Sequence, residues 1–199
     1  MSRLGCSLFV LALIVTTVAG CGGTKKSGAS LDAQYRKAMA EPDPAARVNQ
    51  LLTVADKQGK AGDLLGMEQS LNAAADAAKG MDDAKGKALA LNRVAEALGK
   101  AGRASEAKSL LREVSKAADQ ITEDEIKVSV LSRMALVYGK YLNGQDVATG
   151  YLKNCEETAA GIQRPEGRID ALLDVALTYH QLAMADKAKG LLDQTLQAA

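Results

Sequence analysis

The residue types that most often do chemistry are scarce in this chain, which has three cysteines and one histidine. His180 has no cysteine, histidine or carboxylate partner at a metal-ligand spacing, so it does not predict a zinc site, and we interpret it as a surface or helix-capping residue. Neither a Gly-x-Ser-x-Gly nucleophile elbow nor a Gly-x-x-x-x-Gly-Lys-Ser/Thr phosphate loop occurs in the sequence. We therefore predict no catalytic residue, no metal ligand and no cofactor.

The first twenty residues have the order of a secretory signal peptide. A short start with one basic residue, Arg3, precedes an almost unbroken apolar run over residues 6–18, and the small residues Ala19 and Gly20 follow it. The apolar run is shorter than the ~20 residues that span a bilayer comfortably. We expect residues 1–20 to be removed, with an uncleaved N-terminal membrane anchor as the alternative.

Val18-Ala19-Gly20-Cys21 resembles the lipobox of bacterial lipoproteins. The resemblance implies cleavage before Cys21 and attachment of a lipid to its sulfur, which would anchor the protein to a bacterial cell membrane, facing the periplasm or the exterior. Residues 21–30 are rich in glycine, serine and lysine, which predicts a flexible tether behind the lipid. In Gram-negative bacteria an aspartate after the lipidated cysteine retains a lipoprotein in the inner membrane. Gly22 stands at that position and favours the outer membrane.

The cysteine count agrees with a lipid-anchored protein. With Cys6 removed and Cys21 acylated, Cys155 would be the one remaining thiol, and an internal disulfide would be impossible. Cys155 could form an intermolecular disulfide or be a reactive thiol. We favour the third interpretation, a small buried side chain, because free cysteines are usually buried.

Composition excludes the common modes of nucleic-acid binding. The chain has 25 basic and 24 acidic residues, and the one-residue excess disappears with Arg3 of the signal. Binding to phosphate backbones needs a basic excess that displaces counterions. The five tyrosines and one phenylalanine, with no tryptophan, are too few for platforms on which bases stack.

An internal repeat organises the rest of the chain. Four alanines, Ala55, Ala95, Ala135 and Ala176, are separated by 40, 40 and 41 residues. Similar apolar residues stand seven and four residues before each of them, one before and, except for Gln58, three after, which is one face of a helix. A second helical face lies 12 to 19 residues after each alanine. Short turns separate the two faces, at Gly62-Asp63, Gly102-Arg103, Asn143-Gly144 and Ala185-Asp186.

These patterns predict an all-α domain over residues 31–199. It would be an α-solenoid of about four antiparallel helix pairs with a period of about 40 residues. The repeat units are residues 42–80, 81–121, 122–162 and 163–199, and residues 31–40 form a short N-terminal capping helix. Stacking is expected because one helix pair alone cannot bury both of its apolar faces.

The repeats resemble tetratricopeptide (TPR) repeats, most closely over residues 91–111. There the small residues Ala95 and Ala107 lie twelve apart, and Leu111 follows four later. Three features depart from that family: the period is near forty, the second helix has leucine or tyrosine in place of its large aromatic residue, and the proline that ends each unit is absent. The resemblance implies a protein-interaction scaffold. The departures put the family's usual groove and peptide-binding mode in doubt.

A lysine recurs five residues after the first three alanines, at Lys60, Lys100 and Lys140, each preceded by glycine. Stacking would align these lysines into a ladder that could hold an anionic partner. The simpler interpretation, which we favour, is that each lysine complements the negative end of its helix dipole.

The expected concave face, formed by the other side of the first helices, is the second candidate surface. Its residues are polar and acidic in the early repeats and more apolar in the late ones, which suits an extended segment of a partner. It could equally be ordinary packing in a tightly wound solenoid. With the lysines, the candidate partner-binding residues are Asn49, Leu52, Asp56, Asn92, Glu96, Ser132 and Leu173.

Three functions remain open. The first is a membrane-anchored scaffold that binds other proteins of the cell envelope. The second is an envelope enzyme or accessory factor for cell-wall or polysaccharide processing, which would need a cleft of convergent titratable residues. The third is a structural lipoprotein that self-associates through an exposed end of the solenoid, where Leu191 or Leu196 would be uncovered.

Overall fold

The computed structural model describes residues 26–197. In this part of the chain every regular element is an α-helix. The helices are α1 (Lys26–Met39), α2 (Pro44–Lys60), α3 (Leu64–Lys79), α4 (Ala84–Lys100), α5 (Ala104–Ala118), α6 (Asp124–Tyr141), α7 (Gln145–Gly161), α8 (Pro165–Gln181) and α9 (Ala185–Gln197). The signal peptide and Cys21 lie outside the described residues.

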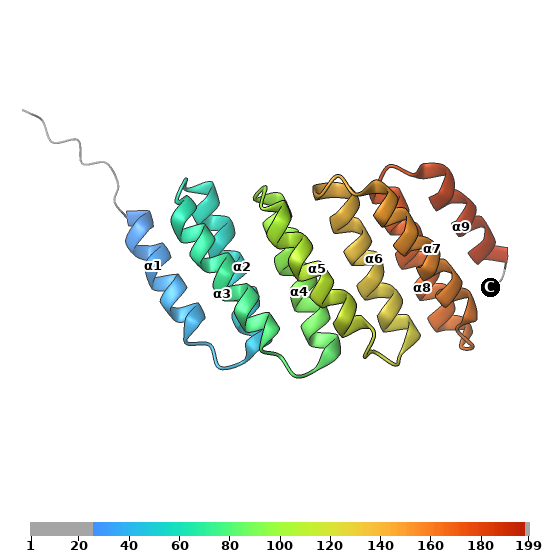
Figure 1. Ribbon diagram of the computed structural model, residues 1–199, viewed down its shortest axis with the longest axis horizontal. Helices are drawn as coiled ribbons and strands as arrows, with labels where there is room; N and C mark the ends of the chain where they lie inside the picture. The colour runs from blue at the N-terminus through green and yellow to red at the C-terminus, as the bar shows by residue number, and fades with distance from the viewer. Residues whose placement is uncertain (1–25, 198–199) are drawn as a thin grey trace, which may run out of the picture.

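The helices stack in chain order into an elongated row (Figure 1). Each helix of even number packs most extensively on the one that follows it, giving the pairs α2–α3, α4–α5, α6–α7 and α8–α9. The first helices of successive pairs, α2, α4, α6 and α8, also contact one another, and each second helix contacts the next first helix. The prediction of an α-solenoid of four helix pairs is confirmed.

The helix α1 takes the place of a second helix at the N-terminal end of the stack. It packs on α2 as α3 packs on α4, and it buries Leu31 and Ala38. The predicted capping helix is therefore present, and it begins at Lys26, five residues earlier than the sequence pattern indicated.

Capping aspartates mark where α2, α3 and α4 begin. The carboxylates of Asp43, Asp63 and Asp83 accept hydrogen bonds from backbone N–H groups in the first turns of α2, α3 and α4. Such caps satisfy N–H groups that have no partner inside the helix, and each typically stabilises it by ~1 kcal/mol.

The turns inside the pairs share a left-handed residue. Gly62, Gly102 and Asn143 have positive φ, at 78°, 75° and 51°, as expected for glycine and asparagine after a helix end. The fourth turn differs from the prediction at Ala185-Asp186, because α8 ends at Gln181 and α9 already begins at Ala185. Ala183 is the left-handed residue there, with φ 59°. No glycine or asparagine marks this turn, so the sequence pattern placed it too late.

A continuous core runs through the pairs. The four repeated alanines are at most 3% exposed, and the leucines four residues before the first two, Leu51 and Leu91, are fully buried. Small residues at the repeated alanine positions let neighbouring helices approach, while the larger side chains fill the space between layers.

Within the described residues, we find no helix that combines the length and the apolar character needed to cross a membrane.

Candidate functional site: a cleft between the first two helix pairs

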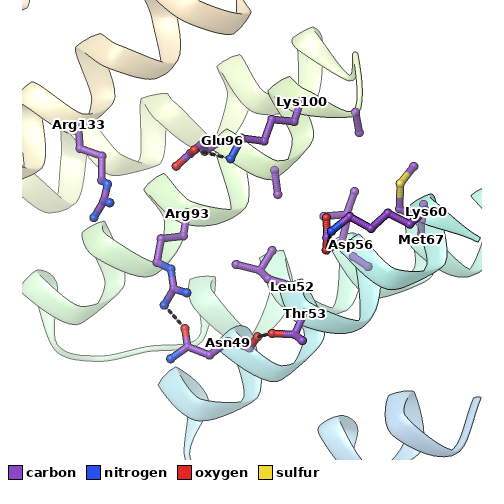
Figure 2. Close-up of a pocket in the computed structure, with 15 residues that line it drawn as sticks. Asn49, Leu52, Thr53, Asp56, Lys60, Met67, Arg93, Glu96, Lys100 and Arg133 are labelled. Carbon is purple, nitrogen blue, oxygen red and sulfur yellow. Dashed lines mark hydrogen bonds and ion pairs between the residues drawn. The ribbon is translucent and has the colours of Figure 1, made fainter. Parts of the chain in front are cut away.

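A cleft of about 640 Å³ lies between α2 and α4 (Figure 2). Its apolar lining comes from small and medium side chains of three helices. Around these are polar and charged side chains from α2 and α4 and, from the next pair, Arg133 of α6. The apolar lining residues are Leu52, Ala55, Met67, Leu71, Ala97 and Ala101, with Gly59 beside them. The polar and charged ones are Asn49, Thr53, Asp56, Lys60, Arg93, Glu96, Lys100 and Arg133.

Six of the ten residues predicted from the sequence to bind a partner line this one cleft. They are Asn49, Leu52, Asp56, Lys60, Glu96 and Lys100. The repeat explains their convergence, because positions one turn apart on α2 and the equivalent positions on α4 face the same space when the two first helices stack.

Two of the charged pairs in the cleft lie within single helices. Lys60 Nζ lies 2.6 Å from Asp56 Oδ2, and Lys100 Nζ lies 2.6 Å from Glu96 Oε1, both with i,i+4 spacing. The hydrogen bond with Glu96 raises the pKa of Lys100 above its ordinary value, although partial burial opposes the shift. Each carboxylate of the cleft is thus already engaged by a lysine of its own helix.

Arg93 and Arg133 carry the uncompensated charge of the cleft. Both are exposed, and among the described residues neither forms an ion pair with a carboxylate. Arg93 donates a hydrogen bond across the mouth of the cleft to Asn49, and the two guanidinium groups extend in the same direction from neighbouring first helices (Figure 2). Neither arginine was among the residues predicted from the sequence. The available signal was their shared position, two residues before Ala95 and Ala135.

Asn92 and Ser132 do not belong to an accessible surface, which corrects their assignment as partner-binding residues. Asn92 is fully buried and Ser132 is 2% exposed. The Asn92 side-chain amide donates a hydrogen bond to the backbone oxygen of Val130, 2.9 Å away, and so ties α4 to α6. Asn92 thus faces α6, the next first helix, whereas the side chain of Ser132 lies beside Cys155 of α7.

Leu173 occupies the same repeat position in α8, but no further pair covers it. It is 42% exposed, and Leu177 one turn later is 54% exposed. At the end of α9, Leu196 is 77% exposed, as the sequence analysis expected, whereas Leu191 is buried. An apolar surface therefore marks the C-terminal end of the described solenoid, distant along the chain from the cleft.

The structure gives neighbouring lysines of the repeat shared surroundings. Lys60 and Lys100 line the same cleft, and the Nζ atoms of Lys100 and Lys140 lie 5.7 and 5.6 Å from the ring centroid of Tyr141. Each lysine is also in the last turn of its helix, so the dipole interpretation stands beside the ladder.

Cys155 and His180 also have side chains that can take part in chemistry. Cys155 is fully buried, and burial raises the pKa of its thiol to about 11. His180 is exposed in the last turn of α8. In the described part of the chain, no three histidine, cysteine or acidic side chains come together in a way that could hold a metal ion.

No protein-family model and no curated protein matches the chain. Among solved structures it is similar to Ton1535 from Thermococcus onnurineus NA1, with a TM-score of 0.67 and 17% sequence identity. The match covers 84% of this chain and 48% of that one, so this chain spans about half the length of Ton1535. At this identity the similarity concerns the helical fold alone.

Proposed function

We propose that this protein is a non-catalytic binding module, held at a bacterial membrane by a lipid on Cys21, which captures a protein of the cell envelope in the cleft between α2 and α4. The cleft is the observation that carries the proposal. It combines an apolar lining with charged and amide groups at its rim, the combination that anchors and orients a bound side chain. The lipobox-like residues and the tether over residues 21–30 support the anchoring.

Site-specific crosslinking tests the binding role. In one variant, a photoreactive amino acid replaces Thr53, which is exposed at the rim. In a second variant it replaces Lys108, an exposed residue of α5 outside the cleft. We expect adducts with a partner from the native membrane fraction at position 53 and not at position 108. Equal adducts at both positions, or none at position 53, would remove the cleft from the proposed function.

Mass spectrometry of the protein from its native membrane fraction tests the anchor. We expect an N-terminal peptide that begins at an acylated Cys21. Cleavage at another position without lipid, or an intact Met1, would leave a helical binding module without this membrane address.

Self-association is a second candidate, favoured by the exposed Leu173 and Leu177. The equivalent residues Leu52 of α2 and Asn92 of α4 face the following first helix, so the same position in α8 suits a helix of a second copy. Sedimentation over a range of concentrations tests it. Association that Leu177→Asp abolishes would support this role, and a monomer at all concentrations would exclude it.

A further inference from the structure

The interfaces between successive pairs repeat one packing arrangement, formed by a glycine and a residue of the next unit. A Cβ added to Gly99 of α4 would lie 2.7 Å from Tyr141 Cβ, and one added to Gly139 of α6 would lie 2.6 Å from a methyl group of Leu182. In the repeat, Tyr141 and Leu182 are equivalent residues, each six after its repeated alanine. We call the surface around each such glycine a socket and the residue seated on it a plug.

The first socket has no plug. Gly59 of α2 is the equivalent glycine, and Ala101 is the residue at the plug position of the next unit. A Cβ on Gly59 would meet only Met67 of its own pair within 4 Å. Both Gly59 and Ala101 line the cleft. In the other two interfaces, Tyr141 and Leu182 fill the equivalent position. The cleft lies where the first interface has only an alanine at that position.

The second interface shows what such a socket accepts. The ring of Tyr141 lies within 6 Å of the ammonium groups of Lys100 and Lys140, a favourable distance for cation–π attraction. The equivalent lysines of the first interface are Lys60 and Lys100, and both line the cleft. An aromatic ring in the first socket would therefore have Lys60 and Lys100 as its cationic neighbours.

The charge at the rim of the cleft sets a second requirement for the bound segment. The cleft has four cationic side chains and two carboxylates, and the carboxylates are paired with Lys60 and Lys100. Arg93 and Arg133 are left to bind an anion, and a guanidinium group matches the planar geometry of a carboxylate.

We propose that the first socket receives an aromatic side chain, tyrosine or phenylalanine, from a partner protein segment whose nearby carboxylate is held by Arg93 and Arg133. This specificity rests on the proposed function of the cleft. The partner residue would take the place that Tyr141 takes one repeat later, and the anion would lie outside it at the rim.

Peptide selection with a plugged variant tests the proposal. Random 12-residue peptides displayed on phage are selected on the full chain, and binding is then compared with Ala101→Tyr, Ala101→Leu, Ala101→Ser and the Arg93→Gln/Arg133→Gln double variant. The first two supply plugs of the kind seen at Tyr141 and Leu182, so two independent variants fill the same space. Ala101→Ser keeps the socket empty and is the matched control.

We expect selected peptides to share an aromatic residue with an acidic residue close by. Their affinity should fall at least ten-fold with either plug and with the double arginine variant, and should be retained with Ala101→Ser. Peptides that compete at the cleft but share no aromatic residue, or bind equally without the two arginines, would overturn the proposed specificity and leave the binding role intact. Peptides unaffected by both plugs would overturn the cleft as the site, and the absence of any selected peptide would count against both proposals.

Discussion

Tyr141, the last residue of α6, packs against Gly99 of α4 so closely that a Cβ on residue 99 would lie 2.7 Å from Tyr141 Cβ. The glycines that precede Lys100 and Lys140 thus have a steric role between repeats. Gly99 is itself buried in the last turn of α4. The lysine after it can reach the same tyrosine ring, so one Gly-Lys pair contributes both to packing and to charge at the interface.

Gly99→Ala should therefore destabilise the protein. Overpacking of a core typically costs ~1–3 kcal/mol, and the better helix propensity of alanine returns only ~0.5–1 kcal/mol. Gly59→Ala is the matched control, because its methyl group would meet only the flexible Met67 side chain, with Sδ 3.0 Å away. Urea unfolding should show a loss for Gly99→Ala and little change or a gain for Gly59→Ala. Equal effects would contradict the socket packing.

The hydrogen bond between Ser70 and Gln58 should matter because both side chains are buried. The Ser70 hydroxyl donates to Gln58 Oε1 at 2.7 Å. Ser70→Ala leaves that oxygen without its partner, and we expect a loss of ~1–3 kcal/mol in the free energy of unfolding. The double variant Gln58→Leu/Ser70→Ala removes both polar groups and should be more stable than Ser70→Ala alone. A double variant that is less stable would show that the polar pair is not the cause.

Ala183→Gly should stabilise the protein. Ala183 has φ 59°, and a left-handed conformation costs an L-residue with a Cβ ~1–2 kcal/mol relative to the right-handed one. Glycine removes this cost at the price of a more flexible unfolded chain, so the expected net gain is up to about 1 kcal/mol. Ala185→Gly, in the first turn of α9, is the control and should give no gain. Thermal unfolding of both variants decides between these outcomes.

Stability should decline at alkaline pH, partly because of Tyr179. Burial, and the hydrogen bond that its hydroxyl donates to Glu156, raise the pKa of Tyr179 well above its ordinary value of 10.0. Because the folded state keeps this phenol neutral, the stabilisation is fully present below pH 10 and is lost progressively as the pH rises above it. Urea unfolding from pH 8 to 11 should show a steeper decline for the wild type than for Tyr179→Phe. Parallel curves would contradict the shift.

Cys155 should react slowly with thiol reagents in the folded protein. Its side chain is fully buried, and the raised pKa of about 11 leaves very little thiolate at pH 8. Peptide mapping after alkylation at pH 8 should find Cys155 unmodified without denaturant and fully modified in concentrated urea. Rapid modification in the absence of denaturant would instead identify an accessible, reactive thiol.

The sequence alone predicted the helical fold because its signal is repeated. The spacing of Ala55, Ala95, Ala135 and Ala176, with apolar residues at helical intervals around each, determines which faces of the helices are buried. It also named six candidate residues that the structure brings together in one cleft, since equivalent positions on stacked helices face the same space. The sequence did not predict the position of the last turn, because an alanine such as Ala183 does not indicate a left-handed residue as glycine or asparagine does.

Only the tertiary structure decided which residues of the first-helix face are accessible. Asn92, Ser132 and Leu173 share one repeat position, yet stacking buries the first two and leaves the third exposed at the end of the row. The sequence did not indicate the cleft either, which lies where Ala101 takes the position that Tyr141 and Leu182 occupy in the next units. A small side chain leaves space between two helices only after the fold has fixed the backbone of both helices.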